Sequence, residues 1–225
     1  MIEGLKNLDW GYYGPELITA MGDTLYMVFW SFLIGGAIGL LIALVLYTTR
    51  AGGIFENKLI YHAMNFVVNL IRPIPFVILI AALQPLTIKV VGSGIGNTAV
   101  VFCMIWASTF AIARIVEQNL VSVDRGVIEA ARAMGASRMR IIGTVVLPEA
   151  LGPLILGYTF VIIALVDMSA LAGIIGGGGI GNFAITEGYN RFRPEVTWLA
   201  VIVVIVFVQA LQILGNFTAR KVMRR

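Results

Sequence analysis

The sequence has 225 residues, of which 59% are apolar and 12% are charged, and its mean hydropathy is +0.93. Soluble domains contain about 45–50% apolar and about 25% charged residues, so this composition excludes an ordinary soluble domain and predicts an all-α polytopic membrane protein. The formal net charge of +4 is then no signal of nucleic-acid binding, because basic residues gather in the cytoplasmic loops of membrane proteins. The only cysteine, Cys103, excludes an intrachain disulfide and a CxxC site.

Apolar stretches with few charges predict five transmembrane helices, at about residues 24–49, 59–84, 95–115, 149–171 and 196–218. The first stretch has no charge from Thr24 to Thr49, and as a helix it is about 39 Å long at about 1.5 Å per residue. This exceeds the hydrocarbon thickness of about 30 Å. It contains Gly35 and Gly39 at the GxxxG spacing, which favours close packing within the chain over a seam between two subunits.

Three parts of the chain are less regular: the second apolar stretch, the connection that follows it, and the glycine-rich segment after the fourth stretch. Arg72, Pro73 and Pro75 interrupt the second apolar stretch, so we predict one long helix from about 59 to 84 with a kink at the prolines. Residues 84–97 contain a proline and three glycines and are expected to form a turn-rich connection. Residues 173–181 read GIIGGGGIG, so we expect residues 173–195 to form an extracytoplasmic loop or a re-entrant break.

The basic residues predict the orientation of the chain. They cluster at Arg50 and Lys58, between Arg114 and Arg140, and in the tail that begins at Arg220. The positive-inside rule places all three clusters in the cytoplasm, which requires an even number of spans between successive clusters. Five spans with the N-terminus outside and the C-terminus inside satisfy this condition, and they make residues 1–225 a single transmembrane domain.

The polar loop at residues 118–148 has the features of a presented helix. Asp124 can cap a helix start, and Glu129 lies in the early turns, where negative charge is favourable. The alanines that follow make a slim helix that would fit a groove, Gly135 permits a turn, and Pro148 would open the next helix. A basic amphipathic helix that lies on anionic lipid is the alternative, and composition alone does not separate the two.

Glu129, Ala130 and Ala131, then Gly135, then Leu147 and Pro148 resemble the EAA loop of ABC-importer permeases, with Val145 where isoleucine is usual. Further segments resemble permease subunits of methionine ABC importers: residues 69–76, 110–117, 132–136, 147–151 and 169–173. The resemblance implies a type I permease fold in which the EAA loop carries a cytoplasmic coupling helix. The residues that it assigns to coupling with the ATPase are Glu129, Ala130, Ala131, Gly135, Leu147 and Pro148.

The same resemblance implies the setting of the protein. The chain would pair with a second copy of itself, two ABC ATPase subunits and an extracytoplasmic substrate-binding protein in the bacterial inner membrane, where membrane lipid surrounds it. It would move methionine or a related amino acid inward. ATP and Mg²⁺ would bind to the partner ATPase, and no cofactor is expected in this chain.

The sequence offers no catalytic chemistry of its own. It contains no P-loop, HExxH or GxSxG motif and no paired carboxylates, so we expect a transport subunit and not an enzyme. Three alternatives remain open. The permease could serve another small solute, such as a different amino acid or a quaternary amine. The chain could also be an ion-coupled secondary transporter, although it shows no internal repeat, or a structural membrane anchor.

Asp167 is a candidate for the translocation path. A carboxylate in a span costs about 2.5–3.5 kcal/mol on insertion scales, which suggests a function. Asp167 could line the path together with Ser169 and Arg72 and meet the ammonium group of an amino acid. Alternatively, it could pair with Arg72 or cap the end of its helix. No metal site is expected.

Overall fold

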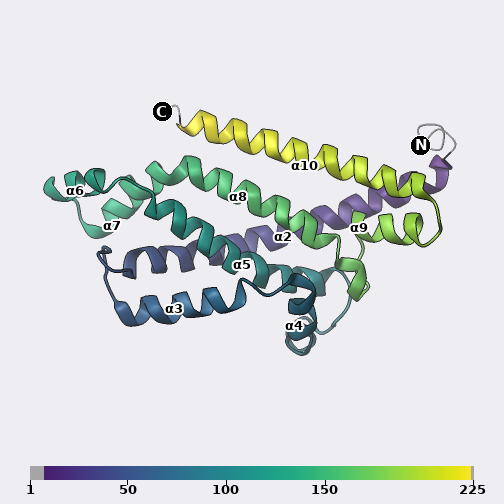
Figure 1. Cartoon of the computed structure of the whole chain (residues 1–225), viewed down its shortest axis with the longest axis horizontal. Helices are drawn as coiled ribbons and strands as arrows, with labels where there is room; N and C mark the ends of the chain where they lie inside the picture. Colours follow the sequence, from purple (N-terminus) through teal and green to yellow (C-terminus); the bar gives the residue numbers. More distant parts are fainter. Residues whose placement is uncertain (1–7, 224–225) are drawn as a thin grey trace.

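The computed structural model describes residues 8–223, and within this range all regular elements are helical (Figure 1). The long elements are α2 (Trp10–Thr49), α3 (Lys58–Ile71), α4 (Phe76–Val91), α5 (Asn97–Val121), α8 (Leu147–Ser169) and α10 (Pro194–Met223). The short ones are α6 (Arg125–Ala133), α7 (Arg138–Ile141), η1 (Ile142–Val146), η2 (Ala172–Ile175), α9 (Ile180–Phe183) and η3 (Ala184–Tyr189). The end of α10 and the helix α6 lie toward one end of the molecule, and α2 begins at the other end (Figure 1).

Helix α2 is longer than its uncharged part. It has 40 residues, and Asp9 caps its start by accepting a hydrogen bond from the backbone nitrogen of Gly11 at 3.1 Å. Its first turns are held by a small core in which Tyr13 packs with Phe183 and Val196. The helix therefore begins at Trp10 and not at residue 24, because packing outside the apolar stretch fixes its start.

The centre of the fold is the contact between α2 and α5. A Cβ atom added to Gly39 would lie 2.7 Å from the carbonyl oxygen of Thr109 on α5, so the GxxxG spacing serves packing within the chain, as predicted. The hydroxyl of Ser108 donates to the carbonyl oxygen of Ser31 at 3.2 Å across the same contact. Helix α8 joins this pair, since the hydroxyl of Tyr158 donates to the carbonyl oxygen of Gly36 at 3.2 Å.

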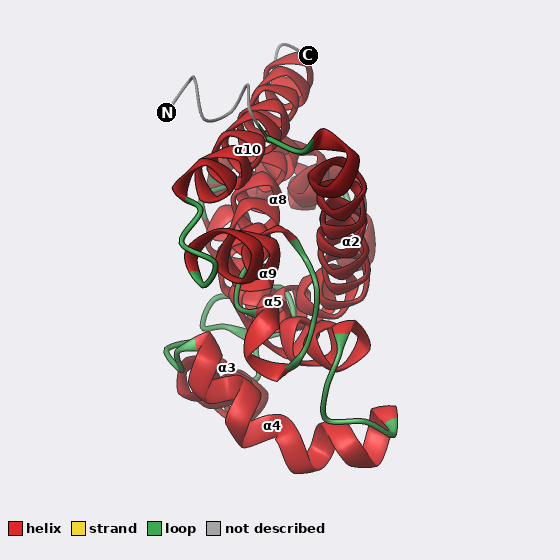
Figure 2. Ribbon diagram, turned by 90° about the vertical axis from the view of Figure 1, so that its right-hand side faces the viewer, coloured by secondary structure: helices red, strands yellow, loops and turns green. Residues whose placement is uncertain are grey.

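The predicted single helix at 59–84 is wrong. It consists of α3 and α4, which meet at an angle of 110°, and Figures 1 and 2 both show α4 turned away from the bundle. Pro73 and Pro75 remove two backbone donors that a continuous helix would need. The turn expected from residue 84 starts later, because α4 continues through Pro85 to Val91 and ends at Gly92, whose φ is +83°.

The helices give the number of spans. Four are long and apolar enough to cross a membrane, and the bent pair of α3 and α4 gives a fifth when it counts as one span. All four are longer than the sequence predicts, and the difference is largest for α2, which begins at Trp10, and for α8, which continues a helix that starts at Arg138. The all-α fold with four to five spans agrees with the sequence prediction.

The glycine-rich segment is more ordered than the predicted loop. It contains the three short helices η2, α9 and η3. Gly176 and Gly179, whose φ angles are +67° and +98°, separate η2 from α9, and α9 continues directly into η3. The side chain of Asn97, at the start of α5, donates to Asp23 Oδ1 at 2.8 Å and accepts from the backbone nitrogen of Gly178 at 2.7 Å. This amide therefore ties the segment to α2 and α5.

Candidate coupling helix and membrane cavity

Helix α6 has a defined start and a defined end. Asp124 caps it by accepting a hydrogen bond from the backbone nitrogen of Gly126 at 2.6 Å. At its end Gly135 has a φ of +79°. The backbone nitrogen of Gly135 donates to the carbonyl oxygen of Arg132, and the backbone nitrogen of Ala136 donates to the carbonyl oxygen of Ala131. These two bonds form a Schellman motif, for which glycine is the preferred residue. The cap and the turn expected from the sequence are both present.

Helix α6, with nine residues, and its C-cap Met134 together present three different faces. Ala131 is buried, at 4% exposure, and packs in the main core together with Ile128. Val127, Ala130 and Met134 are exposed and lie three and four residues apart, so they form one stripe. Arg125, Glu129 and Arg132 line a third face, which turns toward the connection between α2 and α3. Arg125, Glu129 and Arg132 are exposed too, so Ile128 and Ala131 are the residues of α6 that its own chain covers.

The burial of Ala131 differs from the sequence prediction for this residue. We expected it to contact the ATPase, but its side chain faces the core of its own chain. Ala131 therefore supports α6 from within. The EAA pattern did not reveal that the Ala131 side chain points inward, because the pattern does not specify which face of the helix packs against the rest of the chain.

Pro148 does not open a new helix. A helical segment continues from Arg138 to Ser169, and Pro148 lies in the first turn of α8, directly after the π-helical turn η1. The nitrogen of Leu147 bonds to the carbonyl oxygen of Ile142, five residues back. This wider turn accommodates a proline within a continuous helix. Leu147 is partly buried against the core, and Pro148 is exposed.

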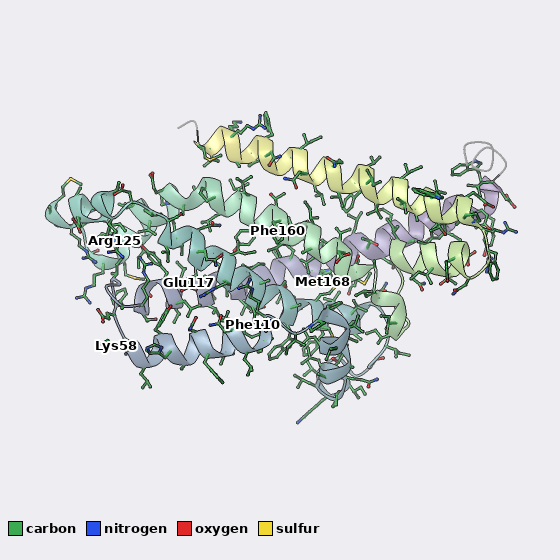
Figure 3. All side chains as sticks on the ribbon, viewed as in Figure 1. Lys58, Phe110, Glu117, Arg125, Phe160 and Met168 are labelled. Carbon is green, nitrogen blue, oxygen red and sulfur yellow. The ribbon has the colours of Figure 1, made fainter. Side chains whose placement is uncertain are left out.

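Three polar contacts missed by the sequence analysis are made by side chains of α5. The side-chain amide of Asn119 on α5 donates to the carbonyl oxygen of Pro153 on α8 at 3.1 Å. Arg114 forms an ion pair with the buried Glu117 at 2.7 Å, and it also donates to Asn65 Oδ1 on α3 at 3.3 Å. Figure 3 labels Glu117 within the bundle, between the chain segments that carry Lys58 and Arg125. The contacts of Asn119 with Pro153 and of Arg114 with Asn65 join residues far apart in sequence, so only long-range pairing could have revealed them.

The candidate path residues are only partly brought together. Asp167 and Ser169 line a cavity of about 300 Å³ between α8, α9 and α10, where Thr24 and apolar side chains complete the wall. Asp167 is exposed, whereas Ser169 is buried and donates its hydroxyl to the carbonyl oxygen of Val166 at 2.6 Å. Arg72 does not line this cavity; it follows the last residue of α3.

The structural alternatives for Asp167 are not formed. Within residues 8–223 the ion pairs are Arg114 with Glu117 and Arg191 with Glu187, so Asp167 does not pair with Arg72. The carboxylate also lies in the last turn of α8, whose C-cap is Ala170, and the negative end of a helix is unfavourable for it. Asp167 is thus an exposed carboxylate that lines this cavity.

Comparison with known proteins identifies the family. A family model described as "Binding-protein-dependent transport system inner membrane component" matches residues 35–225. The chain belongs to this family. Members of the family that resemble it include the probable D-methionine transport system permease protein MetI of Vibrio cholerae, at 38% identity over 93% of both chains. The methionine import system permease protein MetP of Bacillus subtilis is 40% identical over 93% of this chain and 95% of its own.

Solved structures place the fold among inner membrane components of ABC transporters. The MetNI methionine ABC transporter in an inward-facing conformation contains a chain with a TM-score of 0.89 and 37% identity, matched over 92% of this chain and 96% of that chain. An amino acid ABC transporter crystallised with histidines shares the fold, with a TM-score of 0.78 over 93% of this chain and 95% of that chain, at 23% identity. The type I permease architecture expected from the EAA loop is thereby confirmed.

Proposed function

We propose that this chain is the membrane-spanning permease of an ATP-driven ABC importer that moves methionine or a related amino acid inward. Its likeness to the MetNI transporter, at 37% identity over 92% of the chain, is the observation that carries this proposal. The permease itself is not an enzyme. Hydrolysis belongs to a separate ATPase, which would bind ATP and Mg²⁺, and the chain resides in the bacterial inner membrane as a multi-pass protein.

The assembly contains more than this chain. A second copy, two ATPase subunits and an extracytoplasmic substrate-binding protein complete the importer. We place the N-terminus outside and α6 together with the C-terminus inside. This orientation is supported by the basic residues near α6 and in the tail and by the common end at which α6 and the last turns of α10 lie (Figure 1).

The exposed stripe of α6 is the proposed contact with the ATPase. Val127, Ala130 and Met134 present a small apolar surface, and Met134 is 82% exposed. A methionine side chain is flexible enough to fill an irregular groove. Because Ala131 packs into the core and the Schellman motif at Gly135 fixes the helix end, movement of the ATPase would pass to α8 through a helix that moves as one body.

The Asp167 cavity is the proposed part of the translocation path. The carboxylate can accept hydrogen bonds from the ammonium group of an amino acid, and the apolar wall of the cavity suits a side chain such as a thioether. Its volume of about 300 Å³ falls at the lower end of the range of about 300–1,000 Å³ for ligand pockets.

The test is uptake by the reconstituted complex. Permease, ATPase and binding protein are placed in proteoliposomes and offered a panel of labelled amino acids and quaternary amines, with and without ATP. We expect ATP-dependent uptake of methionine that excess unlabelled methionine abolishes. Uptake of a quaternary amine alone would reassign the substrate. Uptake driven by an ion gradient without ATP would overturn the importer proposal itself.

A further inference from the structure

A small cavity separates the coupling helix from the first connection of the chain. It has a volume of about 120 Å³ and lies between α6 and the segment that joins α2 to α3. Its charged lining consists of three arginines and one glutamate, Arg50, Arg125, Arg132 and Glu129, of which Arg50 is half-buried and the others are exposed. Figure 3 labels Arg125 at the same end of the molecule as Lys58, the first residue of α3.

The guanidinium groups of this cavity have donors to spare. Arg50 Nε is buried and has no hydrogen-bond partner within residues 8–223. The ion pairs among the described residues lie elsewhere, and none of them includes Arg50, Arg125 or Arg132. A buried donor without a partner is destabilising, and more so when the group is charged. The lining of the cavity therefore holds an excess of positive charge, three arginines against one glutamate, and none of the three arginines forms an ion pair among the described residues.

The helix ends beside the cavity do not account for all three arginines. Arg50 follows the C-terminus of α2, where a positive charge is favourable. Arg125, in contrast, is the first residue of α6, where the helix dipole disfavours a positive charge. The carboxylate of Asp124 caps this helix end, and Arg125 forms no ion pair among the described residues. Tyr47 forms another wall of the cavity and is 3% exposed, and the guanidinium of Arg50 lies 4.8 Å from the centre of its ring.

We propose that this cavity binds a phosphate-type oxyanion, which Arg50, Arg125 and Arg132 hold between α6 and the connection of α2 to α3. Guanidinium forks match the oxygen atoms of phosphate with two parallel hydrogen bonds. The phosphate can come from free inorganic phosphate or from the headgroup of an anionic phospholipid. The cavity adjoins the end of a membrane-spanning helix, which is the depth at which lipid headgroups lie.

The bound oxyanion would lock the coupling helix to the first span. Two of its ligands lie on α6, and the third follows α2, so the anion would connect two elements separated by more than seventy residues of sequence. Binding depends only on the permease chain. It can therefore be measured without the ATPase, and it does not rest on the proposed transport function.

The experiment uses the purified full-length permease in a phosphate-free buffer. One arm adds inorganic phosphate, and the other adds bicelles of phosphatidylglycerol, with phosphatidylcholine bicelles as the neutral reference. The midpoint of thermal unfolding reports binding in both arms. We expect one of the two probes to raise the midpoint: inorganic phosphate for a free anion, or phosphatidylglycerol for a lipid headgroup.

Variants locate the site. Arg50→Gln and Arg132→Gln should each weaken binding by about tenfold to a hundredfold, since a charge-assisted hydrogen bond contributes about 1.5–3 kcal/mol and each 1.4 kcal/mol is about tenfold. Arg132→Lys keeps the charge but lacks the fork, so it should also weaken binding, and it guards against misfolding of the glutamine variants. Arg140→Gln removes an exposed arginine of the same loop, outside the cavity, and should bind as the unmodified protein does.

Two results would overturn the proposal. One is that neither probe stabilises the permease, and the other is that Arg140→Gln loses as much affinity as the cavity variants. If neither probe binds and Arg50 and Arg132 are needed to capture the ATPase, the cavity receives a carboxylate of the partner protein and not a phosphate.

Discussion

A pair of substitutions on adjacent residues separates the two faces of the coupling helix. Ala130 is exposed, and Ala131 is 4% exposed and packs in the main core. Ala130→Glu adds a carboxylate to the exposed stripe, where surface substitutions change stability by no more than about 0.5 kcal/mol. Ala131→Glu places a carboxylate in an apolar site without a partner, which costs at least about 1–3 kcal/mol.

The two variants should therefore fail in different assays. Ala130→Glu should keep the thermal unfolding midpoint of the permease but weaken ATPase association about tenfold or more, because an unpaired charge buried in an interface costs at least about 1.4 kcal/mol, or one decade. Ala131→Glu should lower the midpoint by several degrees, at about 2–4 °C per kcal/mol for a protein of this size. The measurements are ATPase pull-down, ATP-dependent uptake in proteoliposomes and thermal unfolding.

Ala130→Ser serves as the matched control, since it adds a small polar group without charge and should retain association and uptake. Normal association and normal uptake in Ala130→Glu would refute the exposed stripe as the ATPase contact. An unchanged unfolding midpoint in Ala131→Glu would refute the burial of Ala131 and, with it, the assignment of the faces.

Three further predictions concern packing, the path and the topology. Gly39→Ala should lower the unfolding midpoint, because the new Cβ would lie 2.7 Å from the Thr109 oxygen and overpacking costs about 1–3 kcal/mol. Gly22→Ala is the control and should leave the midpoint unchanged, since its Cβ would have no neighbour within 4 Å. Equal midpoints in the two variants would contradict the close contact of α2 and α5. Asp167→Asn should reduce uptake but leave assembly and basal ATPase activity near normal, and a variant that transports normally would remove Asp167 from the path. Single cysteines introduced at positions 10 and 185 should react with an impermeant reagent from outside, and those at 54, 128 and 222 only from inside. Labelling of position 128 from outside would reject both the orientation and the cytoplasmic role of α6.

Local chemistry made part of this fold predictable. Uncharged stretches indicate spans because a membrane excludes charge, and Asp124 and Gly135 mark the ends of α6 because a cap and a left-handed turn each depend on a few adjacent residues. The contact at Gly39 was also predictable, since small residues at GxxxG spacing permit close helix packing. The EAA pattern likewise marked the coupling segment and the family.

The remaining features depend on which segments meet in space. The tertiary structure decides that Ala131 faces the core, that Pro148 lies within a helix, and that α3 and α4 meet at 110°. It also brings Asn97 to the glycine-rich segment and gathers Arg50 with Arg125 and Arg132 around one cavity. A sequence pattern specifies the faces and ends of each helix, but the partner of each face is set by the packing of helices that are distant along the chain.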